Sequence, residues 1–113
     1  MNKAHERKLR GIKKILMGSQ GYIRVGKHTY QRMKKRGYHR SDIVSCIMRG
    51  FIHEVQTGYN HTIERLAFNY VVTGKDASNN PIVVVLSEEG AQKYSVVTVM
   101  PPTDHNRFND CIG

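Results

Sequence analysis

The sequence predicts an α+β fold, with two or three helices packed on one face of a mainly antiparallel four-stranded sheet. Two observations support this fold class. Apolar residues recur at helical spacing as far as Gly50, and from Phe51 onward they alternate with a period of two residues. The helices therefore precede the strands in the chain, an order that segregates them on one side of an antiparallel sheet.

The part of the chain before Gly50 predicts three helices and one short strand. Residues 1–18 have apolar side chains at helical spacing between basic ones, and residues 22–25 alternate like a strand. Residues 27–37 form the second helix, whose last residue, a glycine, ends it in the left-handed conformation. Ser41 is the expected N-cap of the third helix.

The rest of the chain predicts four strands joined by turns. The expected strands cover residues 51–57, 64–73, 82–86 and 94–100. The expected turns cover residues 58–61, 75–81 and 88–90. Because residues 82–86 are uniformly apolar, we expect them to form a central strand that is covered on both faces.

The chain of 113 residues is long enough for one domain with a modest core, and we expect three parts in it. Residues 1–20 are a basic helical arm, residues 21–100 are the α+β domain and residues 101–113 are a polar tail. The alternative for the arm is a frayed basic terminus that contacts nothing.

Positive charge is concentrated in the first third of the chain. Residues 1–40 contain 13 Lys and Arg against one acid, Glu6, which gives a formal charge of +12. Residues 41–113 contain 5 Lys and Arg against 8 acids, a charge of −3, so the whole chain carries +9. This asymmetry indicates a polyanionic partner on one face. Nucleic acid is favoured over an anionic membrane surface, because the apolar stripe of the basic half is thin.

The composition argues against several other classes of protein. No apolar run approaches the length of a membrane-spanning helix, and the N-terminus lacks the apolar region of a secretory signal. Cys46 and Cys111 are too few for a disulfide framework, and neither the cysteines nor the histidines have the spacing of metal ligands. We therefore expect a cytoplasmic protein without a metal or another cofactor.

The second predicted helix carries the best candidates for chemistry. His28, Arg32 and Arg36 are four residues apart and stack along one helix face, while Tyr30 and Met33 face the core. An imidazole can transfer a proton near neutral pH, and a guanidinium can hold two phosphate oxygens at once. The alternative is a solvated basic face on which His28 only caps its own helix.

Several segments of the sequence resemble the DUF4258 family. Residues 28–38 are similar to its opening motif of His, Arg-Met and Arg-Gly, with Thr29 where the family usually has alanine. The resemblance covers about residues 22–100 and leaves out the basic arm and the tail. Its other matching segments are residues 41–44 and 49–50 in the next helix and residues 70–74, 82–86 and 95–99 in the strands.

The family resemblance implies a compact α+β fold related to RelE-like and BrnT-like toxins, which cleave RNA without a metal. Such cleavage needs groups that move protons and cations that hold the charge of the phosphorane. His28 would then act as acid or base, and Arg32 and Arg36 would stabilise the phosphate. Thr98 would hydrogen-bond a phosphate oxygen or orient the histidine. The residues expected to hold nucleic acid are Lys8, Arg10, Lys13, Lys14, Lys27, Lys35 and Arg65.

Two functions remain open from the sequence. The first is a metal-independent endoribonuclease of the toxin type, with RNA as substrate and a cognate antitoxin as a further partner. The second is a module on the same fold that binds nucleic acid or a host protein without cleaving anything. A His28 that shares a cleft with Arg32 and a hydroxyl group favours the enzyme, whereas a His28 tied to backbone favours the binding module. Arg36 has the alternative of a solvated helix-end charge, and Thr98 that of an ordinary strand threonine.

Overall fold

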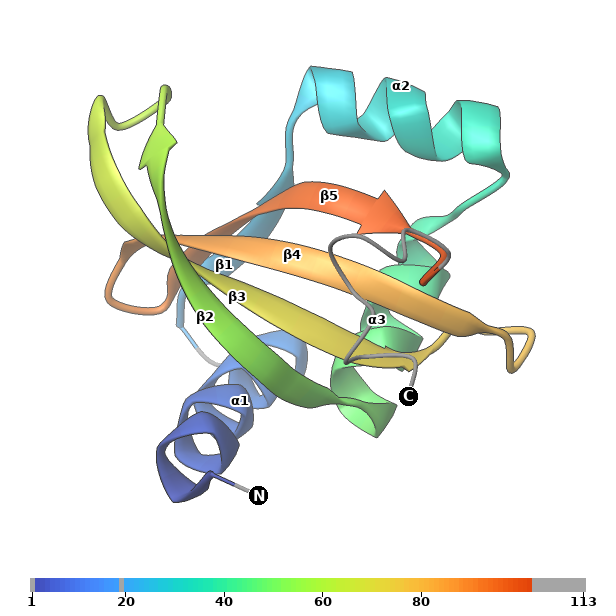
Figure 1. Ribbon diagram of the computed structural model, residues 1–113, viewed down its shortest axis with the longest axis horizontal. Coiled ribbons are helices and arrows are strands. Elements are labelled where there is room, and N and C mark those ends of the chain that lie inside the picture. Colours follow the sequence, from blue (N-terminus) through green and yellow to red (C-terminus); the bar gives the residue numbers. More distant parts are fainter. Residues whose placement is uncertain (1, 19, 103–113) are drawn as a thin grey trace.

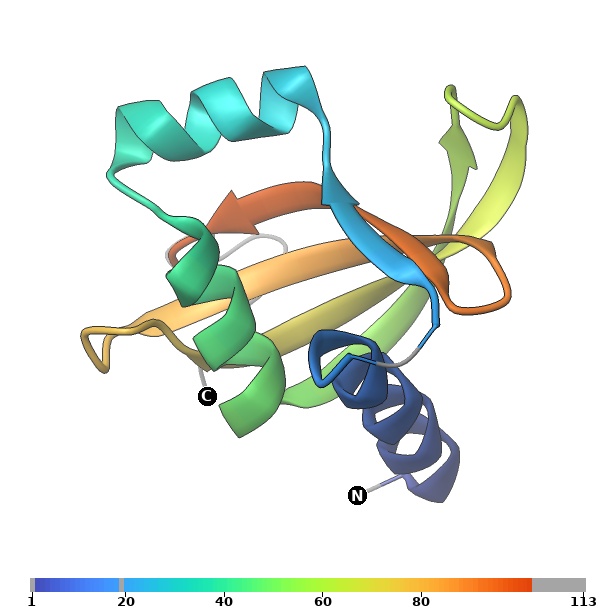
Figure 2. The ribbon, with the colours of Figure 1, turned by 180° about the vertical axis from the view of Figure 1, so that it is seen from behind.

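Within residues 2–18 and 20–102, which the computed structural model describes, the chain forms three helices and one five-stranded sheet (Figures 1 and 2). The α+β class predicted from the sequence is confirmed. Most of the predicted tail, from residue 103 onward, lies outside the described residues. The elements in chain order are α1 (Lys3–Leu16), β1 (Tyr22–Val25), α2 (Lys27–Arg36), α3 (Arg40–Arg49), β2 (Phe51–Asn60), β3 (Arg65–Lys75), β4 (Pro81–Gly90) and β5 (Lys93–Met100).

The prediction of a four-stranded, mainly antiparallel sheet is wrong. The sheet in the described part of the chain has five strands in the order β1-β5-β4-β3-β2, and β1 pairs in parallel with β5, with Ile23 opposite Tyr94. Strands β2 to β5 form the expected antiparallel meander, with β4 inside the sheet. The alternation in residues 22–25 predicts the strand but not its partner, because four residues carry no signal for pairing with the far end of the chain.

Two of the predicted turns are parts of strands. β2 continues through residues 58–60, because the turn begins at Asn60, whose Oδ1 accepts hydrogen bonds from the backbone N–H groups of Thr62 and Ile63 at 2.9 and 3.3 Å. β4 continues through residues 88–90, because both carboxylates of that segment are paired within the fold. The turn at the β3–β4 connection was predicted correctly and lies at residues 76–80.

Two predictions about helix residues are wrong as well. α3 begins after His39 rather than after Ser41, because the Asp42 carboxylate accepts a hydrogen bond from the His39 N–H at 2.8 Å. Tyr30 was expected in the core with Met33, but its side chain is 47% exposed whereas Met33 is 1% exposed. The reason is that α2 packs mainly against β5, at the edge of the sheet, where one narrow stripe of the helix is enough to fill the contact.

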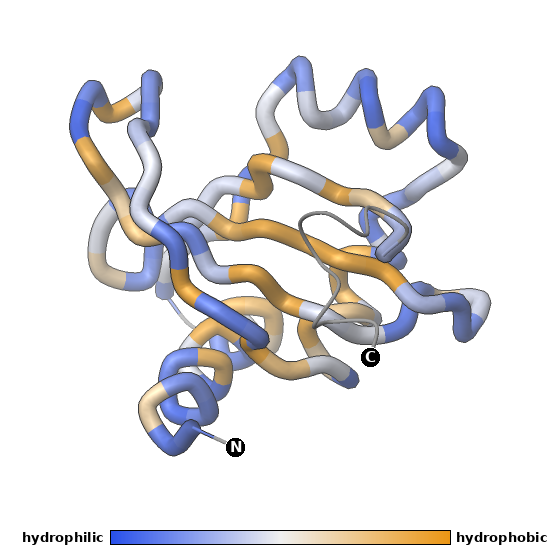
Figure 3. The backbone as a smooth tube through the Cα atoms, in the orientation of Figure 1, coloured by the Kyte–Doolittle hydropathy of each residue, from blue (hydrophilic) through white to orange (hydrophobic). Residues whose placement is uncertain are grey.

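The main apolar core lies between the sheet and the two helices α1 and α3, which cover the sheet face seen in front in Figure 2. The fully buried side chains of this core include Ile12 of α1, Cys46 and Ile47 of α3, and Val84 and Leu86 of β4. A second, smaller cluster lies on the other face of the sheet and consists of Val71, Val83 and Val85, with Met100 packed against them. β4 is therefore buried on both faces, as its uniformly apolar sequence predicts (Figure 3).

A buried carboxylate in β4 connects both edge strands to the middle of the sheet. Glu89 accepts hydrogen bonds from Nε and Nη2 of Arg24 in β1, at 2.8 and 2.6 Å, and from Tyr22 Oη at 3.3 Å. Asn60, at the end of β2, donates to the same carboxylate at 3.1 Å. These hydrogen bonds, above all those from Arg24, lower the pKa of Glu89 below its ordinary value.

The end of α3 touches the sheet at a glycine. A Cβ atom on Gly50 would lie 2.1 Å from the carbonyl oxygen of Thr73 and 2.5 Å from that of Cys46. Backbone atoms cannot move aside as a flexible side chain can, so any larger residue at this position must push α3 away from β3.

We predict that Gly50→Ala lowers the free energy of unfolding by about 3 kcal/mol, the upper end of the cost of overpacking. The matched control is Gly11→Ala in α1, where a Cβ atom would meet nothing within 4 Å. That substitution should raise stability by about 0.5–1 kcal/mol through its helix propensity. Urea unfolding of both variants checks the prediction, and equal stabilities would contradict the close approach at Gly50.

Glu89 should make folding sensitive to acid. Because the folded-state pKa of Glu89 lies below its ordinary value near 4.5, its contribution to stability is fully present above that value and is lost as the pH falls through the folded-state pKa. Glu89→Gln should therefore lower stability at pH 7 and flatten the fall in stability below pH 4.5. Parallel pH dependences of wild type and Glu89→Gln in thermal unfolding would contradict the pairing with Arg24.

Candidate functional site on helix α2

Helix α2 lies against the part of β5 that β1 leaves open. The pairing of β1 with β5 ends at Val96, so the outer edge of β5 beyond that residue has no strand beside it in the described structure. Thr29 Oγ1 donates a hydrogen bond to the Val97 carbonyl at 3.5 Å, and Arg36 Nη1 donates to the Val99 carbonyl at 2.8 Å. These two residues hold α2 parallel to the strand edge (Figure 1).

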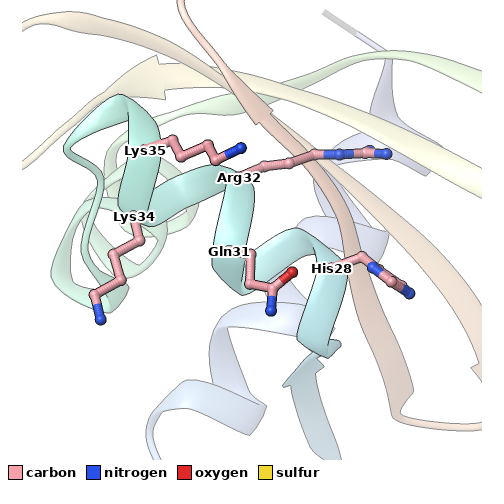
Figure 4. A pocket seen from close by; sticks show the side chains of 5 residues that line it. All are labelled: His28, Gln31, Arg32, Lys34 and Lys35. Atoms are coloured by element: carbon pink, nitrogen blue, oxygen red, sulfur yellow. The ribbon is translucent and has the colours of Figure 1, made fainter.

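The outer face of α2 is basic and open to solvent. A cavity of about 490 Å³ lies along it, and Figure 4 shows the side chains of His28 and Arg32 extending on the same side of the helix. Gln31 and Lys34 point in another direction in the same view. The described residues that line the cavity are His28, Gln31, Arg32, Lys34 and Lys35.

No acidic side chain lies in α2, and the helix is hydrophilic along most of its length (Figure 3). Among residues 2–18 and 20–102, neither His28 nor Arg32 makes a hydrogen bond or an ion pair, whereas Lys8, Arg24, Arg36, Arg49 and Arg65 each do. Both side chains are therefore free to bind a ligand from solution, and an anion would meet only positive or neutral groups on this helix.

A second cavity of about 240 Å³ lies between α2 and the end of β5. Arg32 lines both cavities, so it connects them. Thr98, which is half-buried in β5, lines only this second one. Its described lining residues are Thr29, Arg32, Arg36, Val97, Thr98, Val99 and Met100.

The structure therefore brings the four predicted catalytic residues together only in part. His28 and Arg32 share the first cavity, whereas Arg36 and Thr98 share the second one with Arg32. His28 has no hydroxyl group among the described residues of its own cavity. Arg36 has a structural contact, because its guanidinium donates to the Val99 carbonyl. Sequence spacing alone suggested one continuous face and could not show that its last residue turns toward the strand.

The residues predicted to hold nucleic acid are scattered over the surface. Lys27 and Lys35 are exposed on α2, beside His28 and Arg32. Lys8 is a residue of α1 whose Nζ lies 2.9 Å from Glu88 Oε2, and this hydrogen bond raises the pKa of Lys8. Arg65 donates to the Glu89 carbonyl at 3.0 Å, far along the sheet. The remaining predicted residues, Arg10, Lys13 and Lys14, also belong to α1.

Sequence reasoning missed two lining residues, Gln31 and Lys34. Gln31 lies three residues after His28 and four before Lys35, so the helical spacing that selected the histidine could also have found it.

Cys46 is not a further candidate for a reactive site. Burial raises the pKa of its thiol to about 12, which leaves almost no thiolate at neutral pH.

The described residues offer no group of three or more His, Cys, Asp or Glu side chains that could hold a metal ion. None of the helices in the described part of the chain is long and apolar enough to cross a membrane.

The family model named "Domain of unknown function (DUF4258)" matches residues 25–101. The chain belongs to the DUF4258 family. The DUF4258 region starts at the last residue of β1 and contains α2, α3 and the four strands of the meander, so both cavities on α2 lie within it. α1 lies outside the match. The comparisons with curated proteins and with solved structures found no match.

We predict that the two DUF4258 arginines on α2 differ in their effect on stability. Arg36→Ala removes the donor to the Val99 carbonyl and should lower the free energy of unfolding by about 1.5 kcal/mol, as expected for a hydrogen bond with a charged donor. Arg32→Ala removes no hydrogen bond or ion pair among the described residues and should change stability by less than about 0.5 kcal/mol. Chemical denaturation measures both, and equal losses would contradict the anchoring role of Arg36.

Proposed function

We propose that this DUF4258 protein is a metal-independent endoribonuclease that holds RNA on the outer face of α2 and cleaves it with His28 and Arg32. One observation carries the proposal. His28 and Arg32 are exposed, lack partners among the described residues and line one cavity on a helix without acidic side chains. A relationship of the fold to RelE-like and BrnT-like toxins, with a cognate antitoxin as a protein partner, belongs to the same proposal.

The proposed reaction is an attack of the ribose 2′-hydroxyl on the neighbouring phosphorus. The neutral imidazole of His28 takes the 2′-hydroxyl proton, and water in the open cavity protonates the leaving 5′-oxygen. The Arg32 guanidinium faces the two equatorial oxygens of the phosphorane, where it compensates the developing negative charge. Lys27 and Lys35 hold the neighbouring phosphates, because both are exposed on the same helix.

Arg36 and Thr98 take part at the next phosphate in this proposal. Both line the second cavity, which Arg32 joins to the first. The guanidinium of Arg36 keeps N–H donors besides the one that Val99 occupies, and the Thr98 hydroxyl can donate to a phosphate oxygen. RNA as the substrate is consistent with a cytoplasmic protein, which is the location that we propose.

The second candidate function is a module that binds nucleic acid or a host protein without cleaving it. The separation of His28 from Thr98 favours this candidate, because the imidazole and the hydroxyl line different cavities. Binding alone needs only the exposed cations of α2. Removal of the His28 imidazole should therefore lower the rate of cleavage if the protein is an enzyme, and should leave RNA binding unchanged if it is a binding module.

We predict that His28→Ala lowers the rate of RNA cleavage by roughly 10²–10⁴-fold in the presence of EDTA, which is the usual contribution of one acid–base group. RNA affinity should stay nearly constant, because the lysines and arginines of α2 that hold the phosphates are unchanged. Arg32→Ala should also lower the rate, and Arg32→Lys should restore only part of it, because a lysine cannot hold two oxygens at once. Single-turnover cleavage of total RNA and of tRNA gives these rates.

The matched control is His61→Ala, since His61 is also exposed but lies in the turn between β2 and β3. It should cleave like the wild type. If the wild-type protein binds RNA without cleaving it, the binding module is the correct function. If His28→Ala and His61→Ala both cleave at the wild-type rate, His28 is not the acid–base group.

A further inference from the structure

An exposed aromatic side chain lies near several cations at the edge of the sheet opposite to the edge that α2 covers. Phe51, the first residue of β2, is 40% exposed. Figures 1 and 2 show that β2 starts beside the end of α3 and near α1. Phe51 lines two cavities, one of about 370 Å³ toward β3 and one of about 230 Å³ toward α1. Phe51 therefore borders both cavities.

Basic side chains from three elements line these two cavities. Arg49 of α3 and Lys75 of β3 lie at the larger one, and Arg10 and Lys13 of α1 lie at the smaller one. The guanidinium of Arg49 already has partners within the fold, because it donates hydrogen bonds to Ser45 Oγ, to the Asp76 carbonyl and to the side chain of Asn79. One carboxylate, that of Glu6, also lines the smaller cavity. Positive charge nevertheless exceeds negative charge at both cavities.

A residue that lines the larger cavity has a buried hydroxyl group without a partner. Thr73 lines this cavity, is only 8% exposed and pairs directly opposite Phe51 across β2 and β3. Its Oγ1 is the one buried side-chain oxygen or nitrogen without a hydrogen-bond partner within residues 2–18 and 20–102. Leaving such a group unpaired is unfavourable, so a hydroxyl in this position beside an open cavity points to a ligand that completes it.

We propose that Phe51 and its two cavities bind a nucleotide, with the base stacked on the Phe51 ring and hydrogen-bonded by Thr73. Lys75 at the larger cavity and Arg10 with Lys13 at the smaller one hold the phosphates. An exposed aromatic side chain with cations nearby is an arrangement that binds single-stranded nucleic acid, because every base has a face that stacks. The site shares no lining residue with the cavities on α2, so it does not rest on the proposed cleavage.

The first test compares two exposed phenylalanines. Phe51→Ala should weaken the binding of a labelled single-stranded RNA of about six nucleotides by about 5–150-fold, the usual contribution of one stacked base. Phe51→Tyr should bind like the parent protein. Phe68→Ala, in β3, is the matched control because Phe68 is 55% exposed, and it should not change the affinity. The measurement is fluorescence anisotropy, with His28→Ala in every protein so that the RNA stays intact.

Free AMP and UMP, titrated by calorimetry, identify the source of the nucleotide. Binding of AMP or UMP that Phe51→Ala weakens would show that a free nucleotide fills the site. Binding of the six-nucleotide RNA alone, with the same dependence on Phe51, would show that the ligand is a base within a strand. If neither probe binds, or if Phe51→Ala and Phe68→Ala bind the RNA equally well, the proposal is wrong. Because all RNA measurements use His28→Ala, a failure of the cleavage proposal leaves this result unaffected.

Thr73→Val separates a binding role from a structural one. The substitution keeps the shape of the side chain but removes the unpartnered hydroxyl, so the melting temperature of the free protein should rise. The same variant should bind the RNA more weakly than its parent, since the hydrogen bond to the base is lost. A raised melting temperature with unchanged affinity would contradict the role of Thr73 in binding.

Discussion

The unpaired outer edge of β5 is the constraint on which the candidate site depends. β1 covers this edge only as far as Val96, and carbonyl groups beyond that point need donors that no strand within the described residues supplies. α2 supplies them through Thr29 and Arg36, and it buries one side chain, Met33, in the contact. A helix that covers an edge instead of a face keeps most of its surface in water. The basic face of α2 is exposed for this reason.

Some basic side chains of the chain pair with carboxylates inside the fold, and others remain available to bind a ligand. Arg24 and Lys8 pair with the carboxylates of Glu89 and Glu88 and hold β1 and α1 on the sheet. Such pairs stabilise the fold, but each positive charge is compensated by a negative one, so the pairs add little to the electrostatic potential outside the protein. The side chains on the outer face of α2 and around Phe51 have few or no acidic neighbours, so a polyanion would meet mostly positive charge at those two places.

The helices, the order of the meander and the central position of β4 could be predicted from the sequence, because each depends on local spacing. The partner of β1 could not, since four residues at one end of the chain say nothing about β5 at the other. The candidate site shows the same limit. Spacing placed His28 and Arg32 side by side correctly, but it could not show that Arg36 turns to Val99. The pairing of Thr73 with Phe51 depends on strand register, which the sequence pattern left open.

The most direct test of the account concerns the chemistry of the RNA ends. Purified protein is incubated with tRNA in EDTA, and the new 3′ ends are analysed by mass spectrometry. The account predicts 2′,3′-cyclic phosphates, because attack by the neighbouring 2′-hydroxyl needs no metal and closes that ring. Fragments that end in a 3′-hydroxyl, or tRNA that remains intact, would contradict cleavage on the α2 face.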